Sequence, residues 1–186
     1  MCRKLGVLAV MLLFFVGCSA RQTPIQQALD FRTALLETES CSFRAAVTAD
    51  YGDRFYQFTL NSHTDTQNTE LEVVEPEAIA GIRATVDTTG TTVSFDDAVL
   101  EFGKLANGFV SPVTVPWLLV QCWRQSYIDC SGPDGELERV TYLHGYEDGQ
   151  LAIDTWLDSS GVPVRAEIFY EGRRCITVEI TDFRYS

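Results

Sequence analysis

Apolar residues recur along the chain first with the period of a helix and then with the period of a strand. Over residues 25–39 they return at intervals of three and four, and the preceding proline suits the first turn of a helix. From residue 42 the period changes to two, with Phe43 and Val47 on one phase and polar or small residues on the other. Further alternating runs, separated by turn residues, predict strands at 56–60, 71–73, 82–86, 93–95 and 98–102.

The middle of the chain interrupts this alternation. The stretch SPVTVPWLLVQCWRQSY, residues 111–127, is dense in apolar residues and places Pro116 at a suitable helix start, so we predict a second helix over 116–127. The sequence CSGPDGE that follows is typical of a turn. Alternation then returns in four runs, at 137–143, 151–157, 162–170 and 175–183, each separated from the next by a turn that contains glycine.

These elements predict one α+β domain that is mainly β. The order is one helix, a first group of strands, a second helix and a last group of strands, with about nine or ten antiparallel strands in all. An antiparallel meander of this length must curve, and its concave face then needs apolar cover. We therefore predict an unclosed antiparallel β-barrel whose concave face is covered by the N-terminal helix and the mid-chain helix.

The first residues have the three-part shape of an export signal. Arg3 and Lys4 precede an apolar stretch over 7–16, which is roughly half of the ~20 residues needed to span a bilayer. Cys18 ends the sequence FVGC, which resembles a bacterial lipobox although phenylalanine replaces the usual leucine. In a lipobox the cysteine is acylated and becomes the first residue of the mature chain. The alternative is an ordinary signal peptide, cut nearby, that leaves this cysteine as a free thiol.

The lipobox also sets the expected domain organisation and location. We predict a signal peptide over 1–17, a lipidated anchor and short tether over 18–24, and a single domain over 25–186. The chain is then exported and held by its lipid on the outer face of the cytoplasmic membrane. Removing Arg3 and Lys4 from 14 basic residues leaves 12 against 26 acidic residues, a formal charge of −14. This charge excludes nucleic acid as a partner and disfavours anionic membrane surfaces, although it also serves simple solubility.

Three phrases of the sequence resemble a known family. They are LEVVEPEAIAGIRATVDTTGTTVSFDD, VPWLLVQCW and LAIDTWLDSSGVPVRAEIFYEGRRCITVEITDF. With the element order and the lipobox, they look like the LolA-like lipoproteins of Gram-positive bacteria, relatives of the periplasmic outer-membrane lipoprotein carrier, mycobacterial lipid-binding lipoproteins and spore-germination lipoproteins. The resemblance implies a LolA-like half-barrel, with helices plugging its mouth and an apolar cavity for acyl chains. The periplasmic carrier is soluble and shuttles, whereas this chain carries an anchor, which counts against a carrier role.

The apolar residues of the concave face are candidates for such a cavity. Burial of apolar area drives acyl-chain binding, and the second helix is apolar on more than one face, which places it between the sheet and another apolar group. Plain core packing explains the same pattern, and the sequence does not separate a filled cavity from an open one. The candidate cavity residues come from the first two strands and the second helix: Phe43, Val47, Tyr56, Phe58, Leu60, Trp117, Leu118 and Trp123.

Four cysteines remain if the lipobox cysteine carries the lipid. They are Cys41, Cys122, Cys130 and Cys175, and an even number in an exported chain predicts two disulfides with three possible connectivities. We favour Cys122 with Cys130, which closes a short loop, and Cys41 with Cys175, which ties the first strand to the last. The strand phase argues against the second pair, because Cys41 lies on the inward phase and Cys175 on a polar one. Without an oxidising pathway, all four stay free thiols.

The sequence contains no catalytic signature. There is no G-x-S-x-G, no H-E-x-x-H and no phosphate loop, and the two histidines, His63 and His144, lie in or near predicted turns. Most paired carboxylates also lie in predicted turns, where aspartate caps its own backbone. No short cysteine or cysteine-histidine spacing suits zinc. We therefore expect a binding protein rather than an enzyme, without a cofactor or metal.

Two functions fit these expectations. The first is a membrane-anchored extracytoplasmic lipoprotein that binds a lipid or lipidated ligand in the half-barrel. The second is a non-enzymatic docking or activator subunit for a cell-envelope or spore-germination enzyme, and a weaker third is an envelope-stress sensor domain. An acyl-chain binder requires an open apolar cavity, whereas a docking subunit has a close-packed interior and an exposed apolar patch or edge strand. The expected partner is therefore an acyl chain or an envelope protein.

Overall fold

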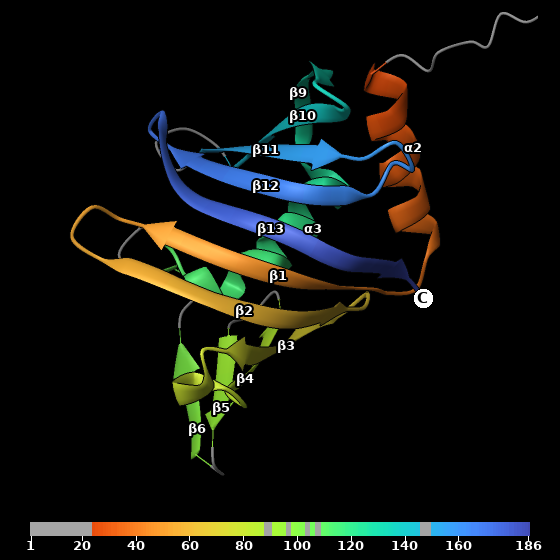
Figure 1. Cartoon of the computed structure of the whole chain (residues 1–186). Coiled ribbons are helices and arrows are strands. Elements are labelled where there is room, and N and C mark those ends of the chain that lie inside the picture. The colour runs from red at the N-terminus through yellow and green to blue at the C-terminus, as the bar shows by residue number, and fades with distance from the viewer. Residues whose placement is uncertain (1–23, 88–90, 96–97, 103–104, 107–108, 146–149) are drawn as a thin grey trace, which may run out of the picture.

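Two helices and one long sheet make up the domain (Figure 1). The computed structural model describes residues 24–87, 91–95, 98–102, 105–106, 109–145 and 150–186, so the predicted signal peptide and Cys18 lie outside the described residues. The helices are α2 (Pro24–Glu37) and α3 (Val115–Gln125). Single 3-10 turns lie at Glu77–Ile79 and Pro112–Thr114. The strands are β1 (Cys41–Asp50), β2 (Phe55–Thr64), β3 (Asn68–Glu75), β4 (Arg83–Asp87), β5 (Thr91–Phe95), β6 (Ala98–Phe102), β7 (Leu105–Ala106), β8 (Phe109–Val110), β9 (Tyr127–Asp134), β10 (Leu137–His144), β11 (Leu151–Leu157), β12 (Pro163–Tyr170) and β13 (Arg173–Tyr185).

The main sheet of the described chain is an antiparallel meander of eleven strands, ordered β6-β5-β4-β3-β2-β1-β13-β12-β11-β10-β9. The first and last strands pair in its middle, with Ala45 opposite Ile180 and Val47 opposite Val178. The chain therefore runs outward from the centre to β6 and returns inward from β9 to β13. A separate pair, β7 and β8, precedes α3. The sheet edges do not pair with each other, which confirms the predicted unclosed β-barrel.

The alternation read from the sequence corresponds to alternating burial. In β1 every second side chain from Cys41 to Ala49 is buried, and the residues between them are exposed or half-buried. The neighbouring β2 presents Phe58 and Leu60 to the same side, opposite Val47 and Ala45. Because successive side chains of a strand point to opposite faces, these residues line one continuous apolar face.

Both helices cover this concave face, as predicted. Helix α3 lies behind the central strands in Figure 1, and α2 lies at the end of the sheet where β1 begins. The buried core joins Ala28, Phe31 and Leu35 of α2 to Leu119 and Trp123 of α3 and to the inward residues of β1, β2 and β10 to β13. The Gln27 side-chain amide also donates to the carbonyl of Asp158, 2.7 Å away, and fixes the first turn of α2 to the turn between β11 and β12.

Strand β9 was missed by the sequence analysis, which placed a turn there. Its sequence, YIDCSGPD, has weak strand propensity, and Gly132 and Pro133 are residues that strands disfavour. The strand forms because it lies at the edge of the sheet and pairs only with β10, where a proline costs no interior hydrogen bond. Together with β6, it raises the main sheet of the described chain to eleven strands, above the nine or ten expected.

Candidate interaction surface

Trp123 is the centre of the concave core. Its side chain is fully buried, and its ring packs against those of Phe31, Phe43 and Phe183 at centroid distances of 5.5, 5.8 and 6.2 Å. The indole N–H donates to the hydroxyl of Thr155 on β11, 2.9 Å away, so the polar atom of this buried ring has a partner. Helices α2 and α3 therefore meet strands β1 and β13 around this one aromatic side chain.

The structure places most of the candidate cavity residues in this packed core. Six of them are at most 8 % exposed: Phe43, Val47, Phe58, Leu60, Leu118 and Trp123. Trp117 is half-buried and packs against both this core and the smaller cluster of Leu71, Ala84 and Val86. Tyr56 is separate from the rest, because it is 40 % exposed and its ring contacts Tyr51 at 6.3 Å near the tip of the β1–β2 hairpin. Ligand binding by these residues stays a prediction.

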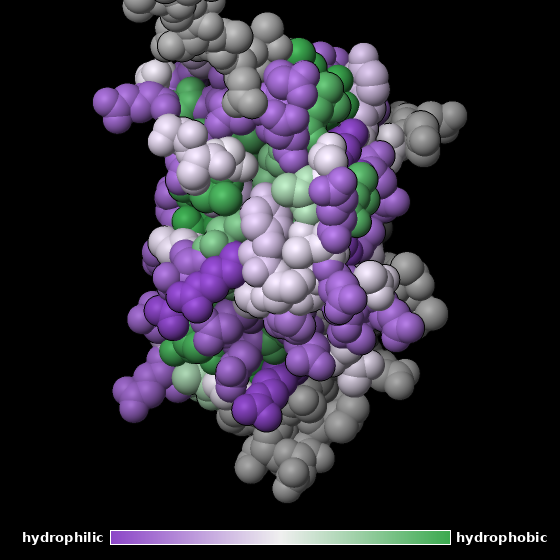
Figure 2. Space-filling view, turned by 90° about the vertical axis from the view of Figure 1, so that its right-hand side faces the viewer, coloured by the Kyte–Doolittle hydropathy of each residue, from purple (hydrophilic) through white to green (hydrophobic). Residues whose placement is uncertain are grey.

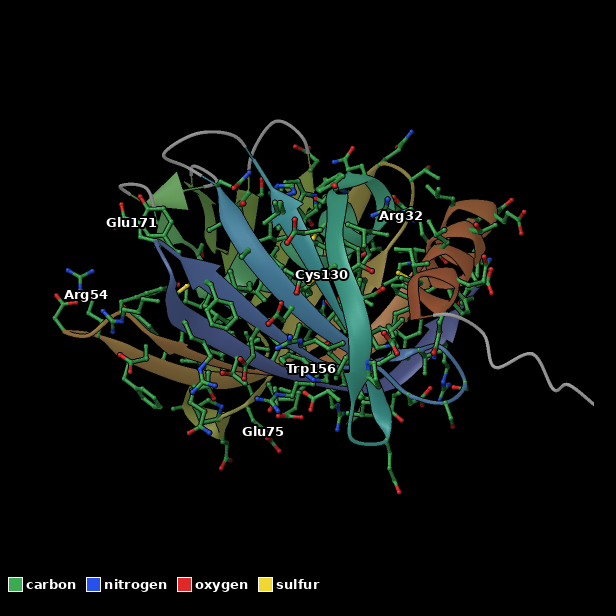
Figure 3. The ribbon with its side chains drawn as sticks, turned by 90° about the horizontal axis from the view of Figure 1, so that it is seen from above. Arg32, Arg54, Glu75, Cys130, Trp156 and Glu171 are labelled. Atoms are coloured by element: carbon green, nitrogen blue, oxygen red, sulfur yellow. The ribbon has the colours of Figure 1, made fainter. Side chains whose placement is uncertain are left out.

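Arg32 of α2 clamps the end of α3, and the sequence analysis did not single it out. Its Nε donates to the carbonyl of Trp123 at 2.8 Å, and its Nη2 donates to the carbonyl of Ser126 at 2.6 Å. Its guanidinium also lies 5.7 Å from the centre of the Tyr142 ring. The carbonyls at the C-terminal end of a helix lack partners within the helix, so Arg32 satisfies two of them while it joins the two covering helices. Figure 3 labels Arg32 next to α2.

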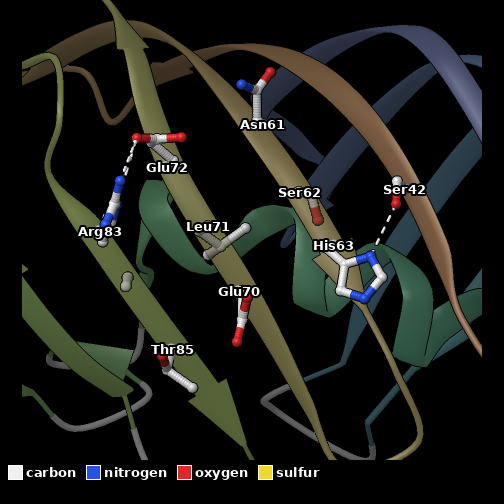
Figure 4. Close-up of a pocket in the computed structure, with 10 residues that line it drawn as sticks. Ser42, Asn61, Ser62, His63, Glu70, Leu71, Glu72, Arg83 and Thr85 are labelled. Atoms are coloured by element: carbon white, nitrogen blue, oxygen red, sulfur yellow. Dashed lines mark hydrogen bonds and ion pairs between the residues drawn. The ribbon is translucent and has the colours of Figure 1, made fainter.

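A polar groove of about 630 Å³ lies on the outer side of β1 to β4 (Figure 4). Cross-strand pairs form it: Ser42 and His63 are joined through Oγ and Nδ1 at 2.9 Å, and Arg83 donates to the Glu72 carboxylate at 3.2 Å. The Glu70 carboxylate does not point toward the imidazole in Figure 4. The groove therefore offers polar contacts but lacks the carboxylate that orients a catalytic histidine.

The second histidine is held in a similar way. His144 Nδ1 and the Ser126 hydroxyl lie 2.8 Å apart at the junction of α3 and β9, and burial lowers the pKa of this imidazole. Ser126 itself is buried. Among the described residues, neither imidazole has a carboxylate hydrogen-bond partner, and no three His, Cys, Asp or Glu side chains are grouped to hold a metal ion. No described helix has the length and apolar content needed to span a bilayer.

Neither favoured disulfide is present in the described structure, where Cys41, Cys122, Cys130 and Cys175 are all unpaired. Cys41 lies opposite Tyr185, ten residues along β13 from Cys175, which is about 30 Å at the rise of a strand. Cys122 is buried in the core, whereas Cys130 of β9 is exposed and lies opposite Thr141 of β10. The short sequence spacing does not bring the two thiols together, because Cys122 lies in α3 and Cys130 lies in the edge strand β9.

The free thiols predict selective labelling of the domain 19–186. Burial raises the pKa of Cys41 to about 11 and that of Cys122 to about 12, so neither forms the reactive thiolate near neutral pH. In the native state we expect an alkylating reagent to label Cys130 first, with all four thiols labelled in denaturant, as read by intact mass. A native mass four hydrogens below the reduced value would contradict this expectation, and Cys130→Ser is the control that should abolish the fast phase.

Large apolar side chains are exposed at two places outside the core. Helix α2 exposes Ile25, Leu29 and Leu36, and Tyr127 is exposed at the start of β9. At the other end of β1, the β1–β2 hairpin projects from the sheet and exposes Phe55 and Tyr56 near its tip (Figure 1). Their exposed fractions lie between 40 % and 68 %. These two groups of exposed side chains are therefore candidate contact surfaces.

Comparisons with known proteins find similarity at the level of structure. No protein-family model and no curated protein sequence matches the chain. A LolA superfamily protein from Nitrosomonas europaea is similar at 9 % identity and a TM-score of 0.46, over 89 % of this chain and 94 % of that chain. The Mycobacterium tuberculosis lipoprotein LppX is similar at 13 % identity and a TM-score of 0.43, over 86 % of this chain and 92 % of that chain.

A third similar structure is that of the CwlD amidase from Clostridioides difficile in complex with the GerS lipoprotein. The similarity has 16 % identity and a TM-score of 0.43, and it covers 89 % of this chain and 98 % of the matched chain. The structures similar to this chain thus include LolA superfamily and lipoprotein structures.

Proposed function

We propose that this chain is a membrane-tethered, extracytoplasmic lipoprotein that acts without catalysis, as a docking subunit for a protein of the cell envelope. The observation that carries the proposal is the distribution of apolar side chains. Those of the concave face pack on one another, while large apolar side chains are exposed on α2 and on the β1–β2 hairpin. A close-packed interior with apolar groups on the surface is the arrangement expected of a docking subunit.

The packing of the core argues against an acyl chain along the centre of the half-barrel. An acyl chain gains affinity by covering exposed apolar area, but Trp123 and Leu60 are fully buried by other side chains of the domain. Inserting a chain between α3 and β1 would separate Trp123 from Phe43, whose ring centres lie 5.8 Å apart. Binding in this way would break core packing, whereas binding in an already open cavity would not.

The β1–β2 hairpin is the proposed contact for the protein partner. Its aromatic side chains Phe55 and Tyr56 project at the opposite end of β1 from α2, a separation of about 30 Å over the ten residues of the strand. Aromatic residues contribute much of the binding energy at protein interfaces, because they bury a large area at a small cost in conformational entropy. A tether at the α2 end leaves this hairpin accessible to a partner.

Native mass spectrometry of the domain 19–186, followed by organic extraction, tests the choice between the two functions. We expect bare protein from an export-competent host, because the core is filled by its own side chains. Stoichiometric lipid that survives gel filtration would overturn the docking proposal in favour of the acyl-chain binder. Acylation is tested separately by the mass of the membrane-extracted chain, with Cys18→Ala as the control.

The partner contact is tested in cells with a photo-crosslinking amino acid at position 55. The matched control places the same amino acid at Thr66, which is exposed in the turn between β2 and β3. We expect one discrete protein adduct at position 55 that is absent at position 66 and is lost when Tyr56→Ser is added. Equal adducts at both positions, or none at position 55, would contradict the hairpin contact.

A further inference from the structure

We propose that Ile25, Leu29 and Leu36 of α2, here called the α2 stripe, lie against the bilayer to which the chain is tethered. This inference rests on the proposed function in one respect, the attachment of the chain through Cys18. It adds a second, non-covalent membrane contact, which orients the domain so that the β1–β2 hairpin faces away from the membrane.

The three side chains of the α2 stripe lie on one side of the helix. At about 100° per residue, Ile25, Leu29 and Leu36 fall within an arc of about 40°. They are 43 %, 41 % and 60 % exposed. The core contacts of α2 come from Ala28, Phe31 and Leu35, whose mean direction lies about 100° away around the helix. The fold therefore leaves a large part of the α2 stripe exposed, and this apolar area is available to a membrane or to another molecule.

The length of the tether brings the α2 stripe to the bilayer. Ile25 follows Cys18 by seven residues, which span at most about 25 Å when fully extended. Helix α2 has 14 residues and is the first element of the described chain after this segment. From Ile25 to Leu36 the α2 stripe extends about 16 Å along the helix axis, so the whole stripe is within reach of the surface to which the anchor is bound.

The polar residue nearest to this arc does not oppose the contact. Arg32 lies between Leu29 and Leu36 on the same side of the helix, but its guanidinium is turned to the carbonyls of Trp123 and Ser126. Tyr127 follows directly after Ser126 and is exposed, so an aromatic ring lies next to the end of α3 that Arg32 contacts. Tyrosine is enriched at the interface between membranes and water, where its ring is buried and its hydroxyl stays hydrated.

The charges near the α2 stripe favour a bilayer of low surface charge. Asp30 and Glu37 are exposed on the neighbouring side of the helix, and the mature chain carries a formal charge of −14. Anionic headgroups within a Debye length of about 8 Å would repel these carboxylates. Figure 2, which faces the α2 end of the molecule, shows apolar groups separated by hydrophilic ones. The contact therefore depends on the tether, which keeps a weakly binding surface at a high local concentration.

The test attaches the domain 19–186 to vesicles by an N-terminal hexahistidine segment in place of the lipid. The vesicles consist of phosphatidylcholine with a small fraction of nickel-chelating lipid, and the readout is the dissociation rate on imidazole addition. We expect the variant Ile25→Ser, Leu29→Ser, Leu36→Ser to dissociate about fivefold faster than the original chain. The matched control, Phe55→Ser with Tyr56→Ser, removes exposed apolar area at the other end of β1 and is expected to leave the rate unchanged.

Several outcomes would overturn the membrane contact. Equal dissociation rates of the original chain and the stripe variant would do so, as would equal acceleration in the hairpin control. Faster dissociation from vesicles that contain phosphatidylglycerol is expected, and slower dissociation there would refute contact with a neutral surface. Circular dichroism and urea unfolding show whether the stripe variant is folded, and the milder alanine versions of the same changes replace it if it is not.

A second copy of the chain is the competing occupant of the α2 stripe. Sedimentation velocity without vesicles separates the two, because a dimer that the stripe variant abolishes would overturn the bilayer assignment. The vesicle test uses neither native acylation nor a protein partner. Its failure therefore leaves the docking function standing, and failure of Cys18 acylation in cells would remove the membrane tether from the proposed function without changing the vesicle result.

Discussion

Replacing Trp123 with alanine is expected to lower the free energy of unfolding by about 3–5 kcal/mol, the range for removing a large aromatic side chain from a core. The side chain is fully buried against Phe31, Phe43 and Phe183, and these rings come from α2, β1 and β13. The change leaves a cavity at a place where all three elements meet one residue of α3. Urea unfolding of the domain 19–186, followed by circular dichroism, measures the loss.

Two further variants separate packing from ligand binding at this position. Trp123→Phe keeps an aromatic ring but loses the indole N–H, which leaves the buried Thr155 hydroxyl without this donor, so we expect an intermediate loss of about 1–3 kcal/mol. Tyr56→Ala is the control, because the sequence analysis grouped it with Trp123 but it is 40 % exposed, and its loss should stay below about 1 kcal/mol. Unchanged stability of Trp123→Ala would mean that the residue lines an open cavity.

The sheet could be predicted from the sequence because a single face of most strands is buried. In β1, Phe43 and Val47 point to the same, buried side of the sheet. A shift of the strand register by one residue would expose both side chains. Both helices were likewise predicted, since a change from period two to helical spacing is a local property. Strand β9 could not be predicted in this way, because its pairing with β10 overrides a sequence that contains Gly132 and Pro133.

The favoured cysteine pairs could not be judged from the sequence for a different physical reason. Parity and spacing describe which side of an element a residue occupies, but they do not fix its position along the element. Cys41 and Cys175 lie on the paired strands β1 and β13, yet at opposite ends of them, because the antiparallel register sets Cys41 against Tyr185. Only the full register excludes the bond, and the register depends on the long return of the chain through α3 and the four strands β9 to β12.

The candidate site shows the same limit. The sequence identified the apolar residues of the concave face but not whether they touch, since a filled core and an open cavity require the same residue types. Trp123 and Tyr56 share an apolar pattern, and only their positions at the centre and at the hairpin separate them. The helical spacing over residues 25–39 predicts a single apolar face that includes Leu29 and Leu36, whereas α2 has a buried face and a separate exposed stripe.

Arg32→Met is expected to lower the free energy of unfolding by about 2–4 kcal/mol. The methionine keeps the apolar stem but leaves the carbonyls of Trp123 and Ser126 without their charged donor, and hydrogen bonds to charged groups are among the stronger ones in proteins. Arg32→Lys should restore less than half of the loss, because an ammonium cannot reproduce the two-carbonyl geometry or the planar contact with Tyr142.

Arg124→Met is the matched control, since Arg124 belongs to the clamped helix and donates a single described hydrogen bond, to the carbonyl of Asp65 at 3.0 Å. We expect its loss to be about 1 kcal/mol. Hydrogen exchange locates the effect: opening of the α3 end in Arg32→Met should deprotect residues 123–126 more than the centre of β1. If both arginine variants lose the same stability and exchange equally, Arg32 is an ordinary surface residue and α3 is held by its apolar face alone. A selective loss instead identifies Arg32 of α2 as the residue that holds the C-terminal end of α3 in the half-barrel.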